Sequence, residues 1–435
     1  MTAYIAPLPL AATLEALRSG QQDLIAAVNA LCDRIEAIDG ELQALLPEPN
    51  RRERLLAEAR ALLERYPNPA ERPVLFGAFL AVKDIFHVDG FVTRAGSQLP
   101  PELFAGEEAE TVRALRAAGA LIVGKAVTTE FAYYEPGPTG NPYNLKHTPG
   151  GSSSGSAAAV AAGISNLALG SQTVGSVIRP AAFCGVIGYK PSFGRISTHG
   201  VVPFSQSADH VGLFTQDVAG LVLACSVLCS AWRSQLAPLS SPVLGVPEGP
   251  YLDQMPSEGR AAFEQQIAQL EAAGYVIKRV QAFGDLATIA QRHRRMIAAE
   301  IAQVHAEWFK QHEALYRERT AGIIREGQPV TVEALEESRA ARFELRQQLH
   351  EQMDAEGIDL WVCPPAFGPA PESLQVTGDP AMNMPWTNSG LPALTVPAGK
   401  AANGLPLGLQ LVARFERDEE LLAWAAGIAE LCAQL

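Results

Sequence analysis

The chain has 435 residues, of which 48% are hydrophobic and 19% charged, so it contains enough apolar material for a large globular core. Its formal net charge of -13 at pH 7 argues against a nucleic-acid partner, because phosphate binding requires a basic face. The first residues lack the basic and apolar segments of a signal peptide and no run of about 18 apolar residues follows, so we expect a cytoplasmic protein with no membrane contact.

Helical periodicity dominates residues 1–70. Apolar residues recur at intervals of three and four within 10–20, 24–39 and 51–66, which predicts an N-terminal layer of helices. The stretch 74–86 is rich in branched and aromatic residues and predicts a buried strand. A helix is expected next, over 109–120, and a second strand directly after it.

The alternation of helix and strand continues through a catalytic core, 71–215. An Ala-rich helix is expected from Ser152 to about Gly163, followed by a strand at 166–170, a loop at 171–176 and a strand near 184–190. Such alternation predicts an α/β protein whose sheet is covered on both faces.

The second half of the chain changes character. Residues 259–357 read as a helical insertion that shapes the pocket, and 358–435 return to the core with strands at 359–364 and 393–399 and a closing helix. No internal repeat interrupts this order, so we expect a single domain over 1–435.

Two short motifs invite functions that their surroundings oppose. Residues 119–126, GALIVGKA, contain the GxxxxGK of a phosphate-binding loop, but the spacer is strand-forming and Ala126 replaces the required hydroxyl residue. Residues 151–155, GSSSG, form a GxSxG centred on Ser153, yet turn residues precede them instead of the strand that a nucleophile elbow needs. Asp209 and His210 are adjacent in the chain and therefore unsuited to complete a triad.

We expect neither a metal nor another cofactor. His147, His199 and His210 lie near the motifs of the core, but their spacing matches no metal site, and we expect structural roles for them. The six cysteines lack CxxC spacing and are interpreted as buried, reduced thiols: Cys32, Cys184, Cys225, Cys229, Cys363 and Cys432.

A longer pattern runs from Gly150 to Arg195, and it is joined by KD at 83–84, TEFAY at 129–133 and PWTNSGLPALTVPAG at 385–399. These segments resemble the amidase signature family, whose members cleave amide C–N bonds with a serine, a second serine in a cis peptide and a lysine. The resemblance implies the amidase signature fold, a single large, mixed and mostly parallel sheet covered on both faces by helices.

The resemblance also implies roles for individual residues. Ser176 takes the position of the nucleophile, Ser152 that of the cis-serine and Lys83 that of the base. A serine hydroxyl needs such a base, and a lysine can act as one when burial disfavours its ammonium form. The oxyanion hole is expected at the backbone of Thr173, Val174 and Gly175.

Two residues near the expected site differ from those common in the family, and two serines are open to more than one interpretation. Gln172 and Val174 stand where relatives commonly carry Asp and Gly. Ser153 and Ser154 are expected to bond to the backbone or support the loop.

Three residues bear on the substrate. Arg179 lies three residues after Ser176, as in the malonamidase-like branch, where an arginine binds the carboxylate of the substrate. Alternatively, Arg179 pairs with an internal acid and shapes a strand after the loop. Phe131 and Tyr133 are expected to line the substrate pocket, although packing roles remain open for both.

The function expected from these residues is hydrolysis of a small amide or ureide that carries a carboxylate, through an acyl-enzyme on Ser176. Two alternatives stay open: an amidotransferase subunit that releases ammonia within a complex acting on charged tRNA, and a catalytically silent binding protein with the same fold. The partner of the chain is then a small-molecule amide, and a homodimer or a small accessory subunit is left open.

Overall fold

The computed structural model describes residues 4–237 and 239–434, which fold around one ten-stranded sheet in the order β2-β1-β3-β5-β4-β9-β10-β8-β6-β7. The strands have the following bounds: β1 Phe79–Lys83, β2 Leu121–Ala126, β3 Leu167–Gln172, β4 Ile187–Lys190, β5 His210–Thr215, β6 Leu244–Glu248, β7 Ile277–Gln281, β8 Leu360–Cys363, β9 Ala393–Lys400 and β10 Pro406–Val412.

Helices flank this sheet, and four short 3₁₀ helices (η) join them. Their bounds are α1 Leu10–Ser19, α2 Leu24–Leu42, α3 Arg51–Arg65, η1 Pro69–Glu71, η2 Pro101–Phe104, α4 Glu110–Ala117, η3 Glu130–Ala132, α5 Ser154–Ala161, α6 Ile178–Cys184, α7 Val218–Leu228, α8 Pro250–Asp253, α9 Ser257–Ala272, α10 Leu286–Val304, α11 Ala306–His312, η4 Glu313–Leu315, α12 Glu318–Gly327, α13 Val332–Glu356, α14 Met384–Ser389 and α15 Asp418–Cys432.

The sheet is mixed, as predicted, but the prediction that it is mostly parallel is wrong. Among the nine neighbouring strand pairs of the described residues, four are parallel and five are antiparallel. The parallel pairs lie at the two ends, in β2-β1-β3 and β8-β6-β7. The centre is antiparallel, and there the turn 401–405 joins β9 to β10, which is too short for a parallel crossover.

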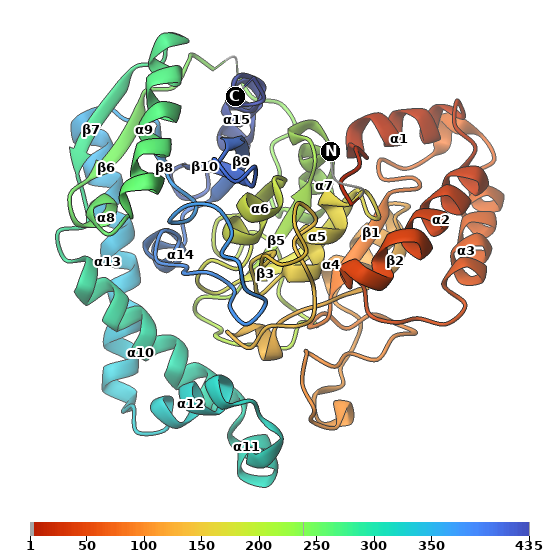
Figure 1. Cartoon of the computed structure of the whole chain (residues 1–435), viewed down its shortest axis with the longest axis horizontal. Coiled ribbons are helices and arrows are strands. Elements are labelled where there is room, and N and C mark those ends of the chain that lie inside the picture. The colour runs from red at the N-terminus through yellow and green to blue at the C-terminus, as the bar shows by residue number, and fades with distance from the viewer. Residues whose placement is uncertain (1–3, 238, 435) are drawn as a thin grey trace.

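Helices cover both faces of the sheet, and the strand β1 shows why. Leu80 and Val82 belong to one hydrophobic core together with residues of α7 and α15, whereas Phe79 and Ala81 belong to a second core with residues of α5, α2 and α3. Alternate residues of a strand point to opposite faces, so a strand that is apolar throughout requires cover on both sides. Figure 1 shows α1 to α3 gathered at the β1–β2 end of the molecule.

The predicted N-terminal helical layer is confirmed by α1 to α3, but the region 259–357 is not helical throughout. It contains β7, which pairs with β6 in parallel and forms an edge of the sheet. This strand is short and mostly exposed or half-buried, so its sequence carries little of the apolar signal on which a strand prediction depends. Beyond β7, helices α10 to α13 form an arm that extends away from the sheet (Figure 1).

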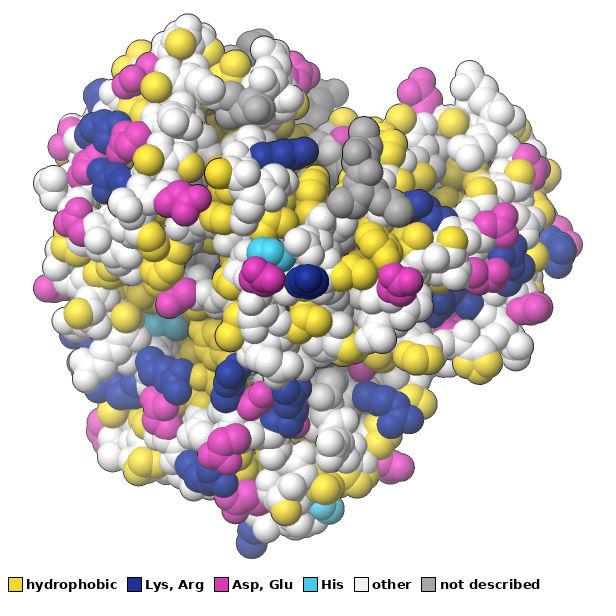
Figure 2. Space-filling view, viewed as in Figure 1, with side chains coloured by type: hydrophobic (Ala, Val, Ile, Leu, Met, Phe, Trp, Pro, Cys, Tyr) yellow, Lys and Arg dark blue, Asp and Glu magenta, His cyan; other side chains and the backbone are white. Residues whose placement is uncertain are grey.

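The surface is mixed in charge. Acidic and basic side chains are interspersed over the face shown in Figure 2. No helix within the described part of the chain combines the length and the apolar character needed to cross a membrane.

Candidate active site

Lys83 is the last residue of β1, and its side chain is fully buried. Burial penalises the ammonium form and lowers the pKa of Lys83 well below 10.5, while the charge of Asp209 acts in the opposite direction. The neighbouring Asp84 pairs with Lys125 instead, at 2.8 Å. Among the described residues no acid forms an ion pair with Lys83, so its environment favours the neutral amine.

Three serine hydroxyls surround Lys83 Nζ: those of Ser152 at 2.7 Å, Ser171 at 2.8 Å and Ser153 at 3.1 Å. A neutral amine carries two N–H bonds and one lone pair, so it can donate to two hydroxyls and accept from the third. Ser153 Oγ donates to the carbonyl of Ser171 and therefore accepts from the amine. In the described structure the hydroxyls of Ser152 and Ser171 have no hydrogen-bond partner other than the amine. Either hydroxyl can therefore donate its hydrogen to the lone pair of Lys83 Nζ.

The serine-rich stretch 150–156 is a buried turn that leads into α5. The peptide bond between Gly151 and Ser152 is cis, as the resemblance predicts. Gly150 precedes it with φ +83°, and a Cβ there would lie 2.7 Å from Pro180 Cα, so this position requires glycine. Ser154 Oγ donates to the carbonyl of Gly150 at 2.8 Å and closes the turn at the start of α5.

Ser176 lies between β3 and α6 and lines a narrow cavity of about 20 Å³ together with Ser152 and Arg179. Within the described residues Ser176 Oγ has no hydrogen-bond partner. The structure thus contains the expected contact between Lys83 and Ser152, but no hydrogen bond between Ser152 and Ser176. Catalytic hydrogen bonds in substrate-free enzymes are often long and tighten when substrate binds.

The narrow cavity has a wider neighbour. Four of its lining residues, Tyr133, Tyr134, Thr377 and Pro380, also line a cavity of about 780 Å³. The space beside Ser176 holds about one water-sized group, so most of a bound molecule would occupy the wider cavity.

The backbone from Thr173 to Gly175 forms the loop before Ser176. The N–H groups of these residues have no acceptor among the described residues, whereas the N–H groups of Val177 and Ile178 donate to Gln172 Oε1 at 2.8 and 3.0 Å. At Gly175 a Cβ would lie 2.3 Å from Asn383 Oδ1, so no larger residue fits there. Successive free N–H groups of this kind can bind an oxyanion.

Arg179 is buried in the first turn of α6, between the loop that carries Ser176 and the strand β4. Its Nε donates to the carbonyl of Thr377 at 2.8 Å and its Nη2 to that of Gly151 at 2.7 Å. Nη1 has no hydrogen-bond partner, and no acid in the described structure forms an ion pair with this guanidinium. The suggested pairing with an internal acid is therefore absent.

The two aromatic residues of the TEFAY motif have different surroundings. Tyr133 lines the narrow cavity, and its hydroxyl accepts a hydrogen bond from Arg294 Nη1 at 2.5 Å. Phe131 does not line this cavity, which corrects the expectation. Its ring packs against His305 and Tyr316, with centroid distances of 4.5 and 5.7 Å, so it belongs to an aromatic cluster beneath the arm.

The two short motifs have structural roles. Lys125 is buried in β2, where its Nζ donates to the carbonyl of Phe86 at 2.7 Å and to Thr93 Oγ1 at 2.9 Å. Ser153 lies at the N-terminus of α5 without a strand before it. All six cysteines are buried and unpaired.

Two of the three histidines near the motifs are packed against the backbone. His147 and His210 are buried, and each Nδ1 contacts a backbone carbonyl, while His199 is exposed. Within residues 4–237 and 239–434 no group of three His, Cys, Asp or Glu side chains could hold a metal ion.

Two contacts of the site escaped sequence reasoning. Ser171 binds Lys83, and a hydroxyl at the carboxyl end of a strand next to the glycine-containing loop was a usable signal for it. Thr377 binds Arg179 from a long loop without regular structure, and no periodicity or motif marks it in the sequence.

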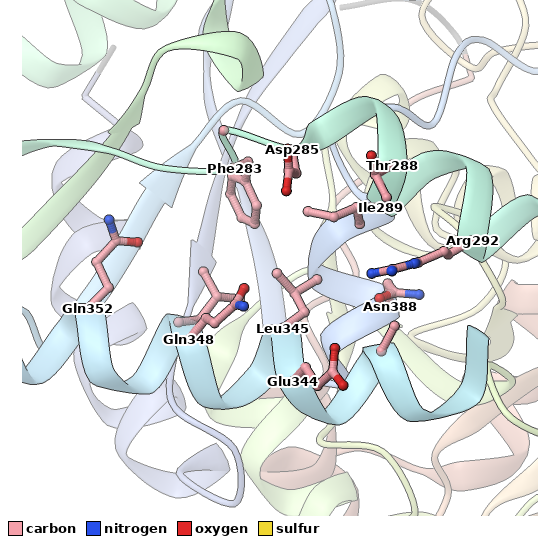
Figure 3. A pocket seen from close by; sticks show the side chains of 13 residues that line it. Phe283, Asp285, Thr288, Ile289, Arg292, Glu344, Leu345, Gln348, Gln352 and Asn388 are labelled. Carbon is pink, nitrogen blue, oxygen red and sulfur yellow. The ribbon is translucent and has the colours of Figure 1, made fainter. Parts of the chain in front are cut away.

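A further cavity, of about 400 Å³, lies between α10 and α13 and is separate from the serines (Figure 3). Figure 3 shows Arg292 and Asn388 at one end of it, and Phe283 and Gln352 toward the other. Its lining mixes charged, amide and apolar side chains.

The ten-stranded mixed sheet, with a buried lysine and a serine-rich turn at the ends of its strands, is the architecture of an amidase-type hydrolase. The chain belongs to the amidase family, whose model, described as Amidase, matches residues 26–422.

Comparison with known proteins agrees with this assignment. The chain is 34% identical to a glutamyl-tRNA(Gln) amidotransferase subunit of Anaeromyxobacter sp. (strain K), with 93% of this chain and 92% of the relative covered. It superimposes on a structure described as a crystal structure of amidase with a TM-score of 0.88 at 31% identity, covering 98% of this chain and 100% of the other. A structure described as a vestigial protein complex that reveals the origins of an s-triazine catabolic enzyme gives a TM-score of 0.86 at 28% identity, with 97% and 98% covered.

The lowered pKa of Lys83 predicts how the free energy of unfolding depends on pH. The unfolded chain has an ordinary lysine pKa of about 10.4, so between that value and the lowered folded pKa the unfolded state binds more protons. The free energy of unfolding of the native protein therefore falls as the pH is lowered through this interval. Lys83→Met has no amine to protonate, so we expect it to escape this loss. Its free energy of unfolding should gain on that of the native protein by about 1.4 kcal/mol for each unit by which folding lowers the pKa of Lys83.

Urea unfolding of both proteins at several pH values between 10 and 7 measures this effect. The stability of Lys83→Met relative to the native protein should rise as the pH falls, and Lys146→Met, which removes an exposed lysine, is measured beside it as the control. A difference between Lys83→Met and the native protein that stays constant with pH would mean that Lys83 is charged in the folded state.

Proposed function

We propose that the chain hydrolyses the C–N bond of a small amide or ureide that carries a carboxylate, through an acyl-enzyme on Ser176. The observation that supports the substrate class is the free Nη1 of Arg179, in a guanidinium that is buried, unpaired with any acid of the described chain and placed beside Ser176. A buried charged donor without a partner is costly, and a carboxylate of the substrate would satisfy it.

The proton path follows from the hydrogen bonds around Lys83. Neutral Lys83 takes the proton of Ser152, which in turn takes the proton of Ser176 as Ser176 Oγ attacks the carbonyl carbon. The N–H groups of Thr173, Val174 and Gly175 bind the oxyanion, and the same path returns the proton to the leaving nitrogen as the C–N bond breaks. Water then cleaves the acyl-enzyme by the reverse sequence.

The position of Arg179 suits a short substrate. It lies on the first turn of α6, three residues after Ser176, and both residues line the same narrow cavity. A carboxylate bound at Nη1 would hold the carbonyl of a small acyl group near Ser176 Oγ, which replaces an encounter in solution by a fixed orientation. Tyr133 and Tyr134 line both cavities, so they would border the part of the substrate that extends from this narrow space into the wider cavity.

A second function is favoured by the relatives. The similar protein from Anaeromyxobacter is named as a subunit of an amidotransferase that acts on glutamyl-tRNA(Gln). In that case the ammonia released at Ser176 would pass to a partner that acts on charged tRNA. The structure described as a protein complex also supports a small accessory subunit for this chain.

Turnover by the purified chain separates the two functions. About twenty amides, half of them with a carboxylate, are offered to the chain alone, and ammonia or amine release is measured. We expect repeated turnover of carboxylate-bearing amides without any partner. Ammonia release that requires a partner complex and charged tRNA would establish the amidotransferase role instead.

Ser176→Ala tests the nucleophile. We expect a loss of activity of at least about a thousandfold, because the acyl-enzyme cannot form, and loss of labelling by a fluorophosphonate. The matched control is Ser156→Ala, since Ser156 is also buried but its hydroxyl donates only to the carbonyl of Leu169. Activity of a few per cent in Ser176→Ala would identify a different serine as the nucleophile.

Arg179→Met tests the recognition of the carboxylate. A charge-assisted hydrogen bond contributes about 1.5 to 3 kcal/mol, so we expect kcat/KM for carboxylate-bearing amides to fall roughly 10- to 100-fold, mostly through KM. Neutral amides with an acyl group of the same length serve as the control and should change much less. An equal loss for both kinds of amide would assign Arg179 to packing alone.

A further inference from the structure

The carbonyl groups of the loop before Ser176 are held from outside the cavity. The carbonyl of Thr173 accepts from His293 Nε2 at 3.1 Å, and that of Val174 accepts from Thr387 Oγ1 at 2.6 Å. The carbonyl of Gly175 accepts from the backbone N–H of Arg179 at 3.1 Å. Each carbonyl in the loop thus has a donor, and the donors to Thr173 and Val174 come from His293 and Thr387, which do not line the narrow cavity.

The planarity of the peptide bond makes these contacts relevant to catalysis. In a trans peptide the C=O and the following N–H point in opposite directions within one plane. Holding the carbonyl of Thr173 outward therefore turns the N–H of Val174 toward the cavity, and holding that of Val174 does the same for Gly175. These N–H groups are two of the donors proposed for the oxyanion.

The hydrogen bonds of His293 define its tautomer. Nε2 faces a carbonyl oxygen, which can only accept, so Nε2 carries the hydrogen. Nδ1 lies 3.1 Å from Asn388 Nδ2, an amide nitrogen that only donates, so Nδ1 is unprotonated. Burial and the charge of Arg342 lower the pKa of His293 to about 4, which agrees with a neutral ring.

His293 and Asn388 come from separate segments. His293 belongs to α10 of the helical arm, and Asn388 belongs to α14, where its backbone carbonyl accepts from Arg342 Nε of α13 at 3.1 Å. The side chain of Asn388 borders the cavity of about 400 Å³ shown in Figure 3. The side chain of His293 therefore connects the arm directly to the oxyanion loop, and the side chain of Asn388 holds the other nitrogen of the His293 ring.

We propose that His293, with its tautomer fixed by Asn388, is a positioning residue that orients the N–H of Val174 for the oxyanion. This inference rests on the proposed reaction at Ser176. His293 does not touch the substrate in this account, and it acts only through the carbonyl of Thr173. Its loss should therefore lower the rate of acylation and leave the binding of the carboxylate at Arg179 unchanged.

Two substitutions of His293 separate orientation from packing. His293→Gln keeps an N–H near the position of Nε2, whereas His293→Met fills the space without a donor. Direct loss of an oxyanion donor costs about 10² to 10³ in rate, so we expect misorientation in His293→Met to lower kcat by about tenfold or more, with KM changed less than about threefold. His293→Gln should recover most of the rate.

The rate of labelling by a fluorophosphonate gives a readout that does not depend on the identity of the substrate, since its phosphoryl oxygen also enters the oxyanion hole. We expect slower labelling of Ser176 in His293→Met and near-native labelling in His293→Gln. His305→Met is the matched control: His305 is a fully buried histidine of the same arm that bonds to Tyr316 and makes no hydrogen bond to the loop in the described structure, so its loss should leave the labelling rate unchanged.

The outcomes distinguish this inference from the proposed function. No labelling of Ser176 in the native protein would reject the reaction itself. Native labelling with an equal rate in His293→Met, or equal defects in His293→Gln and His293→Met, would overturn the positioning role. Should His293→Met fail to fold, Asn388→Ala provides the test, because it borders a cavity and removes only the donor that fixes the tautomer. We expect a fall in labelling of about threefold or more, and an unchanged rate would again overturn the inference.

Discussion

The contact between Lys83 Nζ and three serine hydroxyls is the interaction on which the proposed chemistry depends. A lysine in water is charged at neutral pH and cannot accept a proton, so its usefulness here comes entirely from its burial at the end of β1. Hydroxyls satisfy the amine without supplying the negative charge that would restore the ammonium. The apolar strand, the covered sheet and the pairing of Asp84 with Lys125 all serve this one condition.

The helical arm completes the site from outside the sheet. Arg294 of α10 binds the hydroxyl of Tyr133, and Glu300 of α10 accepts from the hydroxyls of Ser205 and Ser207 in the segment before β5. Farther along, Arg317 pairs with Glu135 at 3.1 Å, just after the TEFAY motif. The arm therefore holds the loops at the ends of the central strands at several points. Such long-range contacts can adapt the site to a substrate without changing the motifs in the loops themselves.

The sequence predicted the local elements and the main motif residues better than the long-range contacts. The helices at 10–20, 24–39 and 51–66 were predictable from their apolar periodicity, and the cis peptide at Ser152 from its motif. The mixed direction of the central strands was not, because strand direction depends on connections and not on local composition. Phe131 was misplaced for a similar reason, since its motif position does not reveal that its ring packs under the arm. His293 lies in a helix without any motif, so only the folded chain reveals its bond to Thr173.

Gln172 shows how a departure from the family pattern fits the surrounding structure. Its Oε1 accepts from the N–H groups that begin α6, and its Nε2 donates to Thr387 Oγ1 at 2.9 Å. Because Thr387 receives this bond, its own hydrogen is free to bind the carbonyl of Val174. An aspartate at position 172 could accept hydrogen bonds but could not donate one to Thr387. The hydroxyl of Thr387 would then donate to this carboxylate, and the carbonyl of Val174 would lose its hydrogen bond. The neutral amide at 172 can accept and donate at once, and it therefore suits the orientation of the loop.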